Sequence, residues 1–177
     1  MKLKATLSTQ SINHLISQLT DYRDSLRQKS ELLVSRLLDE GIKVAYQHTG
    51  RYTGYIEFTK EIENEGTECV GVLIGRDSKP FISKWKYKGG VKEVEVSGIL
   101  MTEFGSGWLS DVRWNVAGVG QGTFPGQTHA TDNGGWWWED VDGSKHHSIG
   151  EPPQYPMYQA NMAMLEQIDK IAREVFR

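Results

Sequence analysis

The stretch Glu103-Phe104-Gly105-Ser106-Gly107 separates two parts of the chain that differ in character. The apolar run directly before it, Gly98-Ile99-Leu100-Met101-Thr102, predicts the end of a strand. After it, residues 105–150 hold ten of the 19 glycines and five of the 6 tryptophans. We expect Phe104 to be buried and the glycines to form a tight turn with positive φ, because glycine lacks the Cβ atom that disfavours this backbone region.

A long amphipathic helix is predicted for residues 8–41. Ser8 or Ser11 suits its N-cap, and Gly41 suits a left-handed C-cap. A helix of roughly thirty residues is near 45 Å long at 1.5 Å per residue, so its apolar stripe must lie across a sheet or against other helices. The stripe consists of Ile12, Leu15, Ile16, Leu19, Tyr22, Leu26, Leu33 and Leu37.

Residues 42–104 carry the pattern of strands and predict an antiparallel sheet with the first helix on one side. The run 69–74 is more continuously apolar, which predicts a central strand. Asp77-Ser78-Lys79-Pro80 and Gly89-Gly90 mark turns between strands. The alternating segments are 42–46, 55–59, 81–87 and 91–96.

A closing helix is predicted for residues 155–177, with Pro156 in its first turn. Between the sheet and this helix, residues 105–150 form a Gly- and Trp-rich insert. A loop of that length is functional or mobile, and Trp136–Asp140 can add one short strand to it. The sequence therefore predicts one α+β domain over residues 1–177, a mostly antiparallel sheet packed by long N-terminal and C-terminal helices.

Composition narrows the class of protein. Of 177 residues 38% are apolar and 24% charged, which is typical of a globular chain, and the net charge of −3 gives no general attraction to nucleic acid or anionic lipid. The single cysteine, Cys69, is expected to be a small core residue. Because the chain shows neither a signal-peptide pattern nor an apolar run of ~20 residues, we expect a soluble protein made inside a cell.

Two motifs that could bind cofactors or metals are better explained as loops. Gly118-Val119-Gly120-Gln121-Gly122 lacks the lysine and the following helix that a phosphate-binding loop needs. His129, His146 and His147 lack a second ligand pair at zinc spacing, and adjacent histidines in a strand point to opposite faces. We therefore expect no cofactor and no metal.

Carboxylates and tryptophans together leave a carbohydrate-binding module or glycoside hydrolase as an alternative. Paired carboxylates suit glycoside hydrolysis, and tryptophans could stack on sugars. The carboxylates are Glu103, Glu139, Asp140 and Asp142. A glutamate at a strand end more often caps a turn or meets an arginine, and the chain has no Gly-x-Ser-x-Gly elbow. The expectation is therefore that the protein is not an enzyme.

The tryptophans Trp136, Trp137 and Trp138 favour contact with other proteins. Successive strand residues point to opposite faces, so at least one of the three must meet a loop, a neighbouring strand or a partner. Residues 105–150 hold five acidic residues against Arg113 and Lys145, which disfavours a platform for single-stranded nucleic acid. The residues expected to make interactions are Glu103, Phe104, Gly105, Gly107, Trp136, Trp137, Trp138, Pro156 and Met157.

Four features in this order resemble the tail-completion or neck proteins of long-tailed bacteriophages, which are described as minor tail components. They are the opening helix closing on Leu37-Leu38-Asp39-Glu40-Gly41-Ile42-Lys43-Val44-Ala45, the Glu103–Gly107 motif, the aromatic insert, and Pro156-Met157-Tyr158-Gln159-Ala160 before the last helix. The family has threonine where Ser106 stands, and the long insert between Gly107 and His147 allows no contact there to be carried over.

The resemblance implies a structural virion protein and no enzyme. It implies a homo-oligomeric, six-fold ring in the phage neck, between the head's connector or head-closure protein and the tail-terminator or tail-tube protein. DNA would pass through the lumen as cargo, and no membrane would be involved. The protein would be made in the host cytoplasm and reside in the virion.

Overall fold

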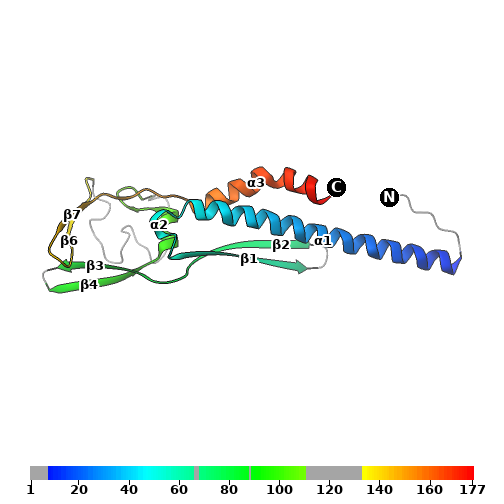
Figure 1. Cartoon of the computed structure of the whole chain (residues 1–177), viewed down its shortest axis with the longest axis horizontal. Coiled ribbons are helices and arrows are strands. Elements are labelled where there is room, and N and C mark those ends of the chain that lie inside the picture. Colours follow the sequence, from blue (N-terminus) through cyan, green and yellow to red (C-terminus); the bar gives the residue numbers. More distant parts are fainter. Residues whose placement is uncertain (1–7, 66–67, 88, 111–132) are drawn as a thin grey trace.

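The computed structural model describes residues 8–65, 68–87, 89–110 and 133–177. These residues form an α+β fold with three α-helices and small antiparallel sheets, which confirms the α+β class. Figure 1 shows an elongated molecule in which one long helix runs beside a hairpin and a second helix. The remaining strands lie at the end of the molecule away from the start of the long helix.

The long helix, α1, spans Thr9–Gln47. Its start agrees with the prediction, because the Ser8 side chain accepts a hydrogen bond from the Ser11 N–H at 3.2 Å. Its predicted end is wrong: Gly41 is not a C-cap, and residues 42–46 are helical rather than a strand. Gly41 is buried inside the helix, and a Cβ at this position would lie 2.9 Å from Met164 Sδ of α3. The glycine thus permits close helix packing instead of ending the helix.

Helix α3 spans Pro156–Val175 and lies along the C-terminal half of α1 (Figure 1). Pro156 stands at the start of the helix, as predicted. An ion pair of 2.6 Å between Arg36 and Glu174 links the two helices near the end of α3. Beyond it, Lys29 Nζ lies 3.5 Å from the carbonyl of Arg177. The two helices run antiparallel to each other (Figure 1).

An antiparallel hairpin of β1, Ile56–Glu65, and β2, Glu68–Asp77, packs against another side of α1 (Figure 1). Lys60 Nζ reaches α1, at 2.8 Å from Ser35 Oγ and 2.6 Å from Asp39 Oδ1. The run 69–74 therefore belongs to a two-stranded hairpin and not to a central strand, as was predicted. Within this run Gly71 lies against Val34 and Leu38 of α1 and Leu73 packs against the core, whereas Val70 and Val72 are each 46% exposed.

The other strands form two further sheets, so the single predicted sheet over residues 42–104 is wrong. A four-stranded sheet has the order β4-β3-β6-β7 and is called the tryptophan lobe below. It consists of β3 (Phe81–Tyr87), β4 (Gly90–Val96), β6 (Trp136–Glu139) and β7 (Lys145–Ser148). The short strands β5 (Ser106–Gly107) and β8 (Gly150–Glu151) pair with each other. The strands predicted at 81–87, at 91–96 and at the tryptophans are confirmed.

The run before Gly105 is a helix, α2 (Gly98–Phe104), and not the predicted strand end. Two side chains satisfy the amides at its start. Ser97 Oγ accepts from the Leu100 N–H at 3.3 Å, and Asp77 Oδ1 accepts from the Ile99 N–H at 3.0 Å. Such capping favours a helix over an extended chain, because the first amides of a helix have no partner within it.

The hydrophobic core lies where the end of α1, the hairpin, α2 and the start of α3 meet. A short 3-10 helix, η1 (Gly50–Tyr52), places Tyr52 in it at 1% exposure. Tyr46 and Phe58 stack edge to face with ring centroids 5.0 Å apart. The buried members are Ala45, Tyr52, Ile56, Phe58, Val96, Met101 and Ala160.

Candidate functional site

The Glu-Phe-Gly-x-Gly motif lies at the junction of α2 with α3. Glu103 Oε2 accepts a hydrogen bond from the Met157 N–H at 2.9 Å, so the carboxylate satisfies an amide at the start of α3. Burial raises the pKa of the Glu103 carboxyl above its ordinary value, while the hydrogen bonds from the Met157 and Tyr158 backbone act in the opposite direction. Glu103 thus caps a helix 54 residues away in the chain.

The two glycines of the motif allow α2, β5 and β8 to approach closely. Gly105 has φ of 74° and Gly107 has φ of 60°, as predicted. A Cβ on Gly105 would lie 2.5 Å from the Glu151 carbonyl oxygen, and one on Gly107 would lie 2.5 Å from the Trp136 ring. A side chain at either position would therefore be strained by its backbone and would also collide with a neighbour.

The chain that enters α3 is fixed to the end of α2. The Thr102 carbonyl accepts hydrogen bonds from the Gln154 N–H at 2.7 Å and from the Tyr155 N–H at 3.2 Å. Tyr155 has φ of 53°, a left-handed conformation that few non-glycine residues adopt. It precedes Pro156, which is buried. These contacts set the direction in which α3 leaves the junction.

An ion pair joins the junction to η1. Arg51 lies 2.6 Å from Glu151 and donates to the Tyr52 hydroxyl at 2.8 Å. Burial raises the pKa of the Tyr52 hydroxyl, so this group stays protonated. Arg51, Tyr52 and Glu151 thus bind one another within the chain.

Five of the expected interaction residues therefore meet at this junction: Glu103, Gly105, Gly107, Pro156 and Met157. Phe104 is half-buried instead of buried, so that prediction is only partly right. The contacts described here are internal and hold α2, β5, β8 and α3 together.

The three tryptophans of β6 alternate as the strand geometry requires. Trp136 packs on Gly107, whereas Trp137 is 73% exposed. On β7, His147 lies beside Trp137 with ring centroids 4.7 Å apart, and His146 stacks on Trp138 at 4.5 Å. Trp136 thus packs from the tryptophan lobe against Gly107 of the junction, whereas the ring of Trp137 is exposed on the surface of the lobe.

The carboxylates considered for glycoside hydrolysis have separate roles. Glu103 caps α3, while Glu139 in the tryptophan lobe forms an ion pair with Lys86 at 3.0 Å. Asp140 and Asp142 accept hydrogen bonds from the backbone of their own turn. Within residues 8–65, 68–87, 89–110 and 133–177, no group of three or more His, Cys, Asp and Glu side chains could hold a metal ion. His129 and the Gly118–Gly122 motif lie outside the described residues.

Two exposed apolar faces lie on the helices, although the stripe of α1 was predicted to lie across a sheet or against other helices. The face of α1 comprises Ile12, Ile16, Leu19, Tyr22 and Leu26, which are 38–56% exposed. The face of α3 comprises Tyr158, Met162, Leu165 and Ile168, which are 37–57% exposed, and Phe176, directly after the helix, is 42% exposed. Exposed apolar faces of this kind mark sites of contact with other molecules.

Length is the signal that could have revealed the face on α1. The 39 residues of α1 extend about 58 Å, whereas the 10 residues of a hairpin strand extend about 33 Å. A hairpin cannot cover such a helix along its whole length, so part of the stripe had to lie outside the core.

A groove of ≈ 400 Å³ lies between α1 and α3, lined by Arg36, Asp39, Glu40, Lys43, Gln167, Lys170, Ile171 and Glu174. Arg36 pairs with Glu174 across the two helices, and Lys43 pairs with Glu40 along α1 at 3.1 Å. The groove is part of the packing of the helix pair.

Comparison of the chain with protein-family models, with curated proteins and with solved structures gave no match. In the part of the chain that the structure describes, no helix combines the length and apolar character needed to cross a bilayer. The exposed surfaces and the junction are therefore the features that bear on the function of the protein.

Proposed function

We propose that the protein is a structural subunit of the neck of a long-tailed bacteriophage. In this role it forms a homo-oligomeric, six-fold ring between the head's connector and the tail tube. The observation that carries the proposal is the exposure of apolar side chains at both ends of an elongated molecule (Figure 1). A joining subunit needs separate contact surfaces for different neighbours, and exposed apolar patches supply them.

One of these ends is the tryptophan lobe. Trp137 is 73% exposed, and Val141, in the turn that follows β6, is 52% exposed. On the other hairpin of the lobe, Ile82 is 42% and Val91 is 52% exposed. Tryptophan is enriched among the residues that anchor protein interfaces. The lobe is therefore the surface we assign to the neighbouring neck proteins.

The charge of the chain is compatible with a channel that DNA passes through. A net charge of −3 provides no general attraction to phosphates, so a lumen built from this subunit would not hold DNA in place. DNA is then cargo and not a ligand, and the protein acts in the virion after synthesis in the host cytoplasm.

Deleting the gene from a phage that encodes this chain tests the proposal. Heads should still fill with DNA and tails should still polymerise, because neither process needs a part that acts at their junction. Electron micrographs of the lysate should show unjoined heads and tails, or joined particles that do not infect. Normal infectious particles would refute the neck assignment, and empty heads with normal tails would move the protein to DNA packaging.

A single substitution tests the role of the lobe. Trp137→Ala should leave thermal unfolding nearly unchanged, because the side chain is 73% exposed. It should reproduce much of the joining defect, since interface anchors contribute roughly 2 kcal/mol or more each, and contacts repeated around a ring add up. If particles carrying Trp137→Ala join and infect normally, Trp137 does not anchor the contact.

The exposed Trp137 ring also supports the alternative of a carbohydrate-binding module or glycoside hydrolase. The observation that supports this alternative is a flat aromatic ring that lies exposed at the surface beside His147, where a sugar could stack on it. Oligosaccharides should then shift the tryptophan fluorescence of the wild-type protein but not that of Trp137→Ala. Absence of any shift across a panel of oligosaccharides would remove this alternative.

A further inference from the structure

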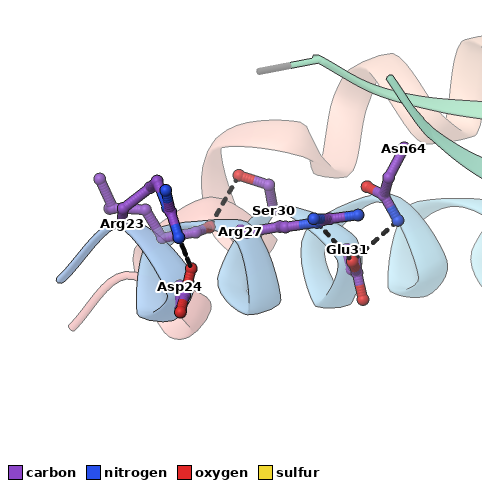
Figure 2. Close-up of polar contacts among 7 residues, drawn as sticks. Arg23, Asp24, Arg27, Ser30, Glu31 and Asn64 are labelled. Atoms are coloured by element: carbon purple, nitrogen blue, oxygen red, sulfur yellow. Dashed lines mark hydrogen bonds and ion pairs between the residues drawn. The ribbon is translucent and has the colours of Figure 1, made fainter. Parts of the chain in front are cut away.

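The hairpin and α3 pack along α1 only as far as about the middle of the helix. At the tip of the hairpin, Asn64 Nδ2 donates to Glu31 Oε1 at 2.8 Å, and Glu31 also pairs with Arg27 at 3.5 Å (Figure 2). At the end of α3, the Arg177 carbonyl reaches Lys29. Residues 9–28 extend past both, as Figure 1 shows. At 1.5 Å per residue they form a helical arm about 30 Å long.

The apolar stripe of this arm has the spacing of a coiled-coil seam. Its positions follow one another at intervals of 4, 3, 4 and 3 residues, which is the a/d pattern of a heptad repeat. They are Ile12, Ile16, Leu19, Arg23 and Leu26. Ser30 takes the next position of the same spacing but lies beyond the arm, and its Oγ donates to the Leu26 carbonyl at 3.0 Å (Figure 2). Arg23 is the single charged residue of the stripe.

The outer face of α3 has the same spacing. Its positions are Tyr158, Met162, Leu165, Asp169 and Ala172, again at intervals of 4, 3, 4 and 3. Phe176 takes the next position, directly after the end of α3. Ala160 and Ile171, on the opposite face, are buried in the contact with the rest of the chain. Asp169 is the single charged residue of this second stripe, and it is exposed.

The two stripes match in length, spacing and charge. When they are aligned in parallel from Ile12 and Tyr158, the fourth position of each places Arg23 opposite Asp169. Arg23 now pairs with Asp24 at 3.0 Å on the surface of its own helix (Figure 2). A pair of exposed neighbours contributes little to stability, so Arg23 can exchange this partner for Asp169.

The arrangement of the chain makes this contact reciprocal. Because α3 runs antiparallel to α1, a second copy turned by 180° presents its α3 parallel to the arm of the first copy (Figure 1). Because α3 covers only the C-terminal half of α1, that second α3 finds the arm uncovered. The same rotation lays the arm of the second copy on α3 of the first, which closes a two-fold pair.

We propose that two copies of this chain pair through reciprocal packing of the α1 arm, residues 9–28, on the outer face of α3 of the other copy. Each seam is a heptad contact with near-parallel axes, and Arg23 of one copy meets Asp169 of the other. The inference goes beyond the neck assignment and holds without it.

Leucine substitutions on two sides of α1 test the seam. Leu19 is 46% exposed and lies on the stripe, whereas Leu32 is 50% exposed and lies on the opposite side of the helix. In sedimentation equilibrium, the wild type and Leu32→Asp should be dimers, and Leu19→Asp should be weakened by roughly a hundredfold or more in Kd. A monomeric wild type, or equal Kd values for the two variants, would overturn the pairing.

Charge reversal tests the register. Arg23→Glu and Asp169→Arg should each weaken the dimer by roughly tenfold, and the double variant should recover most of the loss. If the two single effects simply add in the double variant, Arg23 does not face Asp169.

Cysteine cross-linking tests which helices meet. In a Cys69→Ser background, Leu19→Cys protein mixed with Leu165→Cys protein should form a disulfide between unlike chains on mild oxidation. Each variant alone should form few cross-links. Efficient cross-linking of Leu19→Cys with itself would show that arm meets arm, and would overturn the proposal.

Discussion

Gly105 is the residue at which backbone conformation and packing act together. It has φ of 74°, and a Cβ there would lie 2.5 Å from the Glu151 carbonyl oxygen and 2.8 Å from Pro153 N. Gly134 has φ of 97° with no atom within 4 Å of its Cβ position. We expect Gly134→Ala to lower the free energy of unfolding by about 1 kcal/mol, and Gly105→Ala by more than roughly 3 kcal/mol. Urea unfolding of both variants measures the difference. Equal losses in the free energy of unfolding would mean that β8 can move away from a side chain at position 105.

Glu103 predicts a pH dependence of stability. Its pKa is raised in the folded protein by burial, so the folded state binds the proton more tightly than the unfolded state does. The resulting stability is fully present below the ordinary carboxyl pKa and is lost as pH rises through the raised value. Relative to Glu103→Gln, whose amide oxygen can still accept from the Met157 N–H, the wild type should therefore become less stable between mildly acidic and neutral pH. A stability difference between the two proteins that does not change with pH would contradict this.

At this scale, local requirements were predictable and remote partners were not. The positive φ of Gly105 and Gly107 and the place of Pro156 follow from the residues themselves and their immediate neighbours. The role of Glu103 as a cap could be expected, but not its partner, because Met157 is 54 positions away. Nothing in the local sequence specifies which amide such a carboxylate meets.

Two glycines set how closely the elements approach α1. A Cβ on Gly71 of β2 would overlap Val34 Cγ1 and lie 2.8 Å from Leu38 Cδ1. A Cβ on Gly41 would lie 2.9 Å from Met164 Sδ. Valine is stiff at χ1 and methionine is flexible, so the hairpin should tolerate a methyl group less well than α3 does. We expect Gly71→Ala to cost about 2 kcal/mol and Gly41→Ala clearly less.

Thermal and urea unfolding compare these variants with Gly54→Ala. Gly54 serves as the control because the nearest atom to its Cβ position is Lys79 Nζ, at 4.0 Å. A loss for Gly41→Ala equal to that for Gly71→Ala would show that Met164 is held as firmly as Val34.

The boundaries of elements were less predictable than their existence. Gly41 fits both a C-cap and a close helix contact, and only α3 decides between these roles. The run 98–102 is apolar enough for a strand, but Ser97 and Asp77 cap it as a helix, and Asp77 comes from the end of β2. Both errors arose because a partner distant in sequence determines the local structure.

For the whole molecule, the sequence was sufficient for the α+β class but not for the division into sheets. Alternation identifies β3 and β4, and the tryptophan run indicates β6, yet the pairing of β3 with β6 depends on contacts such as Lys86 with Glu139, which are far apart in the chain. The stripe of α1 was taken for a core face because periodicity reports amphipathic character and not what covers it. The length of the helix shows that part of that face projects beyond the body.

Because the arm projects beyond the body, the backbone hydrogen bonds of α1 should open at different rates in its two halves. Within the body, amides of residues 34–45 open only when the packing of α3 and the hairpin is lost, whereas an arm without such packing is close to the stability limit of an isolated helix. Hydrogen–deuterium exchange should therefore be slow over 34–45 at every protein concentration. Over 12–28 exchange should be fast in dilute solution. It should become progressively slower as the protein concentration rises and copies pair. Uniform protection along α1, independent of concentration, would contradict both the projection and the pairing. The exchange rates of the backbone amides in the arm would thus report whether a second copy is bound.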